Sequence, residues 1–248
     1  MSRPLPLPPV VALLLAAGVV SAAAPPDPDP RALVRAAIQA AGGEEALRAH
    51  PALRWRGRAT VHLSDRKIAL TGYWRLVPPD RAVVETQLAE GGPETMRRLI
   101  VDGDQGWGEQ GGKAEPLPPA ALANERVQFA LYSIVRLVPL LGDDYHLAAL
   151  PAEGGFSALR IAHAGRPDVD AFFAADGRLV RLRTAIIDPD SAHMVDERIE
   201  LSGTIESNGV RWPRALGMTQ DGRPFFNVEL TEFEALPSLP ETLFRPTK

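Results

Sequence analysis

Hydrophobic and polar residues alternate with a period of two in three separate stretches of the chain, residues 67–76, 198–206 and 226–231. In the first stretch Trp74 and Leu76 lie on the apolar side. Such alternation is typical of a β-strand that turns one face toward a core and the other toward water. The pattern therefore predicts a half-buried strand in each of the three stretches.

Dipeptides that favour tight turns separate several strand-like segments, at Asp102-Gly103, Asp176-Gly177, Asn208-Gly209 and Asp221-Gly222. Asparagine or aspartate followed by glycine supplies the positive φ angles of a two-residue hairpin. Successive hairpins without intervening helices predict an antiparallel meander. We therefore predict a mainly β protein with helices, of the α+β class, and not a parallel α/β sheet.

Other segments have the spacing of helices. Apolar residues recur at i, i+3 and i+4 between residues 30 and 41, and Gly42-Gly43 follows as a stop signal. Residues 44–50 predict a short second helix. The segment Pro118–Leu141 is apolar around most of its circumference, with Pro139 expected to kink or end it. A helix this apolar is expected to be buried against the sheet or in the mouth of a barrel.

The amino terminus carries the three parts of a secretory signal. A basic start at Arg3 is followed by the apolar run Val10–Val20 and by small residues up to Ala24. The run is shorter than the roughly 20 residues of a membrane-spanning helix. A removable signal is therefore favoured over an uncleaved membrane anchor.

These features divide the chain into a signal peptide at residues 1–23, a proline-rich tether at 24–30 and a single domain at 31–248. No later apolar run is long enough to span a bilayer, so the chain is predicted not to span the membrane after signal cleavage. Cysteine is absent, so the exported domain must be stabilised by its own core and not by disulfides. The predicted location is the periplasm.

Charge and polar residues exclude several functional classes. There are 27 basic and 31 acidic residues without a basic stripe, so nucleic acid is not a predicted partner. The five histidines contain no i, i+4 pair for a metal. No nucleophile elbow or phosphate-binding glycine loop is present, and the acidic pairs lack the pattern of a calcium loop. We predict no catalytic residue, no metal site and no cofactor.

The tryptophans Trp55, Trp74, Trp107 and Trp212 lie in or beside predicted strands. Ordinary core packing is the best explanation for each of them singly. A sharper hypothesis is that some of them line a cavity. A curved sheet that is too large to be filled by its own side chains can enclose an apolar ligand.

Two segments resemble the LolA/LolB-like superfamily of lipoprotein carriers. Residues 72–81 read Gly-Tyr-Trp-Arg-Leu-Val-Pro-Pro-Asp-Arg, with Val84-Glu85 shortly after, and residues 99–107 read Leu-Ile-Val-Asp-Gly-Asp-Gln-Gly-Trp. The first helix ending in Gly-Gly, the Asn208–Pro213 hairpin and the closing Leu243-Phe244 agree with the same family. The similarity spans most of the chain after the predicted signal.

The resemblance implies a strongly curved antiparallel half-barrel that is plugged by helices, with the segment 118–141 supplying the plug. It also implies a concave apolar face that receives the acyl chains of lipids or lipoproteins. The implied cavity contacts are Trp74, Leu76, Trp107, Phe129, Tyr132 and Leu137.

One position departs from the family pattern. In LolA an arginine stands directly before the strand-ending proline and helps to hold a helical lid shut. Here Val77 precedes Pro78, and the nearest upstream arginine, Arg75, is expected to face away from the side of Trp74. Whether a lid latch exists is therefore open.

Three functions agree with these features. The first is a non-catalytic periplasmic protein that binds an acyl chain, lipid or lipoprotein in the concave face. The second is a periplasmic sensor or protein-interaction module with a filled cavity and an envelope protein as partner. A hydrolase ranks last because no catalytic set stands out. An open apolar cavity of several hundred Å³ would favour the first, whereas a concavity filled by Leu131, Ile134 and Val138 would favour the second.

Overall fold

A computed structural model describes residues 29–189 and 191–247. The predicted signal peptide, and the tether up to residue 28, lie outside the described residues. Within the described ranges, no helix combines the length and apolarity that crossing a membrane would require.

Two short helices open the described chain, α1 (Pro30–Ala40) and α2 (Glu44–Ala49), close to the predicted positions. Asp29 caps α1 through its side chain, which accepts a hydrogen bond from the backbone of Arg31 at 3.0 Å. Gly42 follows with φ 114°. A Cβ there would lie 1.9 Å from the carbonyl oxygen of Gly209, so only glycine allows this close approach.

Most of the remaining described chain is β-structure. The strands are β1 (Ala52–His62), β2 (Lys67–Val77), β3 (Arg81–Leu88), β4 (Arg97–Asp102), β5 (Gln105–Gln110), β6 (Lys113–Pro116), β7 (Tyr145–Glu153), β8 (Phe156–His163), β9 (Val169–Phe173), β10 (Leu179–Ile187), β11 (Met194–Ser202), β12 (Ile205–Ser207), β13 (Val210–Trp212), β14 (Ala215–Gln220) and β15 (Arg223–Leu236). Short 3₁₀ turns are η1 (Pro93–Thr95), η2 (Val138–Leu141) and η3 (Glu241–Phe244).

In the described residues the strands form a 13-stranded sheet of order β6-β5-β4-β3-β2-β1-β15-β14-β11-β10-β9-β8-β7, with β12 and β13 paired separately. Neighbouring strands in it are antiparallel, as in the β1–β2 and β14–β15 pairs. The sheet is open, because β6 and β7 end the order without pairing to each other. The predicted mainly β, antiparallel α+β architecture is confirmed.

Two of the four predicted turn dipeptides have positive φ angles at both residues, whereas at Asp102-Gly103 and Asp176-Gly177 only the glycine does, with φ 62° and 85°. Asn208 and Gly209 have φ angles of 50° and 77°, and Asp221 and Gly222 have 47° and 74°. Two successive positive φ angles are those of a type I′ hairpin turn, whose twist matches that of the flanking strands.

The stretch 226–231 alternates between buried and exposed positions as predicted, and a bulge follows at its end. The stretch 198–206 is interrupted where the sequence suggested continuity. Gly203, with φ 63°, follows the end of β11 and separates it from β12, which belongs to a different sheet. In β15 a bulge shifts the register, so that Arg56 pairs with Glu232 and Gly57 with Leu230. The extra residue moves the buried positions from Leu230 to Phe233.

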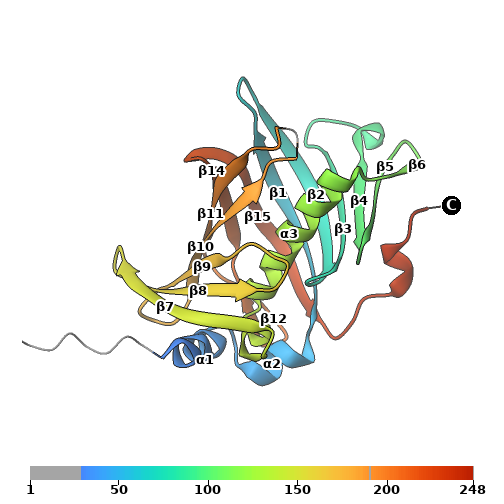
Figure 1. Ribbon diagram of the computed structural model, residues 1–248. Helices are drawn as coiled ribbons and strands as arrows, with labels where there is room; N and C mark the ends of the chain where they lie inside the picture. Colours follow the sequence, from blue (N-terminus) through green and yellow to red (C-terminus); the bar gives the residue numbers. More distant parts are fainter. Residues whose placement is uncertain (1–28, 190, 248) are drawn as a thin grey trace, which may run out of the picture.

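The long helix is shorter than predicted. Helix α3 runs from Pro119 to Val135, and η2 follows after a break at Leu137, which has a positive φ of 63°. The break precedes Pro139 by two residues, and Val138 and Pro139 both belong to η2. The α3 helix contacts both β4 and β10. Figure 1 shows it crossing one face of a strongly twisted sheet, with β7–β9 on one side and β1–β4 on the other.

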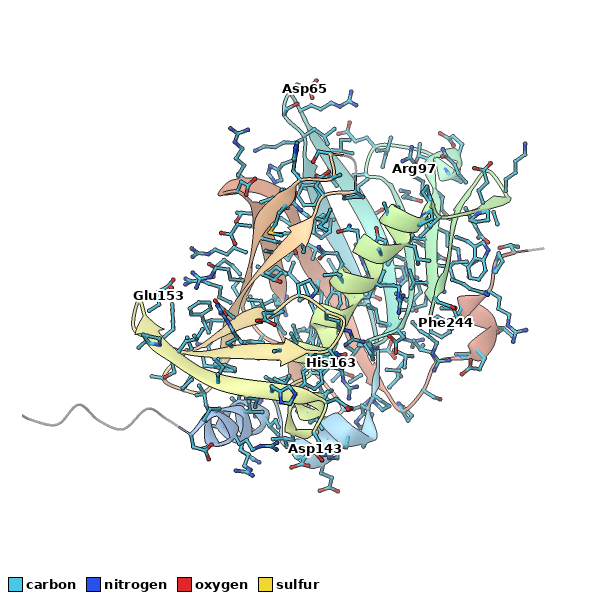
Figure 2. The ribbon with its side chains drawn as sticks, in the orientation of Figure 1. Asp65, Arg97, Asp143, Glu153, His163 and Phe244 are labelled. Atoms are coloured by element: carbon cyan, nitrogen blue, oxygen red, sulfur yellow. The ribbon has the colours of Figure 1, made fainter. Side chains whose placement is uncertain are left out.

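The sheet has a hydrophobic cluster on each face. The large cluster joins α1, α3 and the inner sides of the strands, and it includes Leu76, Ile134 and Phe173. The small cluster, Ala52, Val83, Ile100, Leu239 and Phe244, lies where η3 packs on β3 and β4. Figure 2 labels Phe244 on this carboxy-terminal segment, away from α3. The carboxy terminus thus covers part of the outer face.

Candidate functional site

A cavity of about 330 Å³ lies between α3 and the sheet. Strands from both sides of the helix contribute to its wall, among them β2, β3 and β4 on one side and β10, β11 and β14 on the other. The apolar lining side chains are Trp74, Val84, Leu99, Phe129, Leu131, Tyr132, Val135, Leu182, Ile186, Pro189, Ile199, Leu216, Met218, Phe225 and Phe226. Such a volume and lining are typical of a site for a small apolar ligand.

Helix α3 contributes side chains both to the hydrophobic core and to the cavity. In the second half, Leu131 and Ile134 are each only 5% exposed and join the main hydrophobic cluster. The polar residues Asn124, Glu125 and Gln128, in the middle of α3, line the cavity. The cavity extends along α3, because Leu131, Tyr132 and Val135 also belong to its lining.

An aromatic group forms one wall of the cavity. The ring of Trp55 lies 6.2 Å from Trp74, 5.4 Å from Tyr132 and 6.3 Å from Trp212 between centroids. Trp74 and Tyr132 line the cavity, whereas Trp55, 2% exposed, lies behind them. Gly72 makes room for the indole of Trp74, because a Cβ there would lie 2.4 Å from its Cη2 atom.

A buried carboxyl group holds two amides beside the cavity. Glu197 on β11 is fully buried. Gln128 Nε2 donates to its Oε1 at 2.9 Å and its Oε2 at 3.1 Å, and Gln220 Nε2 donates to its Oε2 at 3.1 Å. Burial raises the pKa of Glu197, while these hydrogen bonds act in the opposite direction.

A second carboxyl, that of Glu125, lines the cavity without a hydrogen-bond or ion-pair partner among the described residues. Its side chain is half-buried. Desolvation raises its pKa from the ordinary value of 4.5 to about 7. Burial raises the pKa of the Tyr132 hydroxyl as well, with a further contribution from Glu125. The cavity therefore contains a carboxyl group that is half-ionised near neutral pH.

Known structures share this arrangement of helix and sheet. A LolA superfamily protein from Nitrosomonas europaea aligns with a TM-score of 0.57 and 13% identity, over 87% of this chain and 97% of that one. The chain has the LolA-like fold. A domain described as an outer membrane lipoprotein-sorting protein from Vibrio parahaemolyticus aligns with a TM-score of 0.53 and 9% identity, over 78% and 88% of the two chains.

A protein of the DUF1329 family from Desulfovibrio piger is similar to the same extent, with a TM-score of 0.56 and 9% identity over 88% of this chain and 98% of that one. The sequence itself matches no protein-family model and no curated protein. The similarity to LolA-like proteins is therefore one of fold, and the predicted resemblance is confirmed at that level.

The LolA-like fold brings three of the predicted contact residues together. Trp74, Phe129 and Tyr132 line the cavity. Leu76 is fully buried in the main cluster. Leu137, 2% exposed, lines a separate cavity of about 240 Å³ beside α1. The part that these residues play in binding stays a prediction.

Trp107 lies elsewhere, on the outer face of the sheet. It packs against the small cluster beneath η3. Its neighbour Gly106 faces α3, where an added Cβ would meet Leu122 at 2.7 Å. Because successive residues of a strand point to opposite faces, Trp107 points away from the cavity.

The lid latch of LolA has no counterpart at the expected position. Val77 packs against the outer cluster. Arg75 pairs with Glu85 at 2.6 Å and stacks over Tyr73, with its guanidinium carbon 4.6 Å from the ring centroid. Arg75 is therefore used in a charge network of the sheet.

The polar part of the cavity, above all Glu125, Gln128 and Glu197, was not among the residues predicted from the sequence. A signal was present, because Glu125 precedes Phe129 by four residues and Tyr132 by seven, which places all three on one helix face. For Glu197, alternation with Ile199 and Leu201 indicated an inward side chain. No group of three or more potential metal ligands occurs among the residues that the structure describes.

Proposed function

We propose that this protein is a non-catalytic periplasmic binder of an acyl chain that belongs to a lipid or lipoprotein. The cavity between α3 and the sheet would receive the chain. In this proposal the open sheet is a half-barrel, α3 is its plug, and export follows from the predicted signal peptide.

The observation that carries the proposal is the apolar lining of an open cavity of about 330 Å³. A soluble domain gains about 25 cal/mol for each Å² of apolar surface that it removes from water, so an unfilled apolar space is costly unless a ligand occupies it. Further support comes from the printed descriptions of two proteins with this fold, which name LolA and lipoprotein sorting.

Binding can be tested with the protein lacking its predicted signal peptide and a neutral fluorescent acyl ester. We expect saturable binding with one ligand per protein. Val84→Trp would fill the cavity from β3 and is expected to weaken binding by about tenfold or more, equivalent to about 1.4 kcal/mol.

Gln87→Trp is the matched control for that variant. Gln87 lies on the same strand but faces the depression on the outer side of the sheet. It should leave binding unchanged, and both variants should be checked for folding by thermal unfolding. Equal binding by all three proteins would overturn the assignment to this cavity, and absence of saturable binding by the wild type would overturn the proposed function.

A sensor or protein-interaction module is the second candidate, and a surface feature favours it. Ile187 and Met194 pair across the end of the β10–β11 hairpin and are 62% and 73% exposed. Phe225, 39% exposed, lines the nearby cavity. If an envelope protein binds these exposed apolar residues, Met194→Lys should abolish the recovery of that protein in a pull-down from envelope extract. Leu63→Lys, at another exposed site, should leave the recovery unchanged.

A further inference from the structure

The charged groups that line the cavity are all acidic. They are Glu125 on α3 and Asp188 after β10, and no lysine, arginine or histidine of the described residues is among the lining side chains. Asp188 already accepts a hydrogen bond from the backbone of Ser191 at 2.7 Å. Both carboxyl groups give the lining negative charge, and Glu125 is the one without a hydrogen-bond or ion-pair partner among the described residues.

The polar groups of the wall offer acceptors to a ligand. Asn124 Oδ1 is buried without a hydrogen-bond partner among the described residues, and Asn124 lines the cavity. The amide nitrogens of Gln128 and Gln220 are directed to Glu197. A buried acceptor without a donor is costly, so a ligand that brings hydrogen-bond donors would relieve this site.

The aromatic wall of the cavity also favours a cationic ligand. Trp74 and Tyr132 line the cavity together with Glu125. Aromatic faces attract cations, most strongly where water is excluded. An anionic head group would be repelled by Glu125 and would find no basic partner in the lining.

We infer that the cavity selects amphiphiles that carry an ammonium group at the end of an alkyl chain, with Glu125 as the counter-ion, over those that carry a carboxylate. This inference deepens the proposed function and rests on it. An ammonium group supplies three hydrogen-bond donors and a positive charge, which matches the acceptors Glu125 and Asn124. The alkyl chain would occupy the apolar remainder of the cavity.

Three probes with the same ten-carbon chain separate the head group from the chain: decylammonium, decanol and decanoate. Their affinities for the protein without its predicted signal peptide can be measured by calorimetry at about pH 8, where Glu125 is mostly ionised. We expect decylammonium to bind at least about tenfold more tightly than decanoate, with decanol between them.

The variant Glu125→Gln tests the counter-ion. This substitution keeps the size of the side chain but removes its charge. The preference for decylammonium over decanoate should therefore fall to about threefold or less, while decanol binding persists. Glu115→Gln is the matched control, because Glu115 is an exposed carboxylate on β6 outside the cavity lining. It should leave the preference unchanged.

A pH series gives a second readout. The titratable groups that share the cavity lining with Glu125 are Asp188 and Tyr132, and Glu197 lies beside it, hydrogen-bonded to the lining residue Gln128. Protonation of Glu125 removes its charge, so the preference for decylammonium should be smaller at about pH 6 than at pH 8 in the wild type and independent of pH in Glu125→Gln.

The outcomes separate the inference from the function on which it rests. If none of the three probes binds and the neutral acyl ester does not bind either, the proposed function fails. If decanol and the acyl ester bind but decanoate binds as tightly as decylammonium, the inference is overturned while the proposed function stands.

Discussion

Replacing Glu125 by glutamine should make the protein more stable at alkaline pH and leave its stability at acid pH nearly unchanged. The carboxyl lies in an apolar cavity without a partner among the described residues, and its pKa rises from 4.5 to about 7. A tenfold change in proton affinity equals about 1.4 kcal/mol, so the folded state disfavours the ionised form by about 3 kcal/mol. This figure is an upper bound, because the side chain is only half-buried and water screens part of the effect.

The direction in which stability changes with pH follows from the protons bound in the folded and in the unfolded state. Between pH 4.5 and about 7 the folded protein keeps the Glu125 proton, whereas the unfolded chain has released it. Folding is therefore progressively weakened as pH rises through this window, and the loss is complete above the folded pKa. Glutamine cannot ionise, so the variant escapes this loss.

Urea unfolding followed by tryptophan fluorescence at pH 5, 6, 7 and 8 would measure the effect. The difference in unfolding free energy between Glu125→Gln and the wild type should be small at pH 5 and should grow to about 2–3 kcal/mol at pH 8. Comparison of two proteins cancels the contributions of the other carboxyls. Parallel curves for the two proteins across this range would refute the reasoning, and Glu115→Gln should give such parallel curves.

Further substitutions test other parts of the molecule. Glu197→Ala should lower the unfolding free energy by about 1–3 kcal/mol, because it leaves the amides of Gln128 and Gln220 unpartnered in a buried place; a neutral result in urea unfolding would contradict the network. Gly72→Ala should cost about 1–3 kcal/mol and weaken acyl-ester binding, because its Cβ would displace the ring of Trp74; unchanged affinity in the fluorescence titration would show that the ring does not shape the cavity. Phe244→Ala should cost about 3–5 kcal/mol in the same unfolding assay without loss of ligand binding, because Phe244 is fully buried beneath the outer face.

Half-buried strands and hairpin turns were predictable because they depend on local patterns, whereas the pairing of β1 with β15 and of β11 with β14 joins strands that are not consecutive in the chain. Alternation in residues 67–76 and the Asn-Gly and Asp-Gly dipeptides specify half-buried strands and hairpins with little tertiary information. The ends of elements were less predictable. The break at Leu137 depends on how α3 meets η2, and the bulge opposite Arg56 depends on the pairing of β1 with β15.

The position of Trp107 shows why one face of a strand can be mistaken for the other. In β5 the tryptophan lies between Gly106 and Gly108, so alternation gives no apolar side to compare. Sequence patterns assume that the apolar residue faces the single core. Here η3 covers the outer face as well, and its Phe244 belongs to the cluster against which Trp107 packs. The orientation of Trp107 is therefore decided by the tertiary position of the carboxy-terminal segment, which local sequence patterns do not specify.

Two of the acidic residues at the cavity, Glu197 and Glu125, differ in a way that bears on function. Glu197 is fully buried but receives hydrogen bonds from Gln128 and Gln220, so part of the cost of its burial is offset within the protein. Glu125 has no such compensation among the described residues, and it lowers the stability of the folded state at neutral pH. A locally unfavourable group in an otherwise consistent structure is most often found at a functional site. The structural carboxyl therefore orders the wall, while the uncompensated carboxyl is the group that a ligand would stabilise.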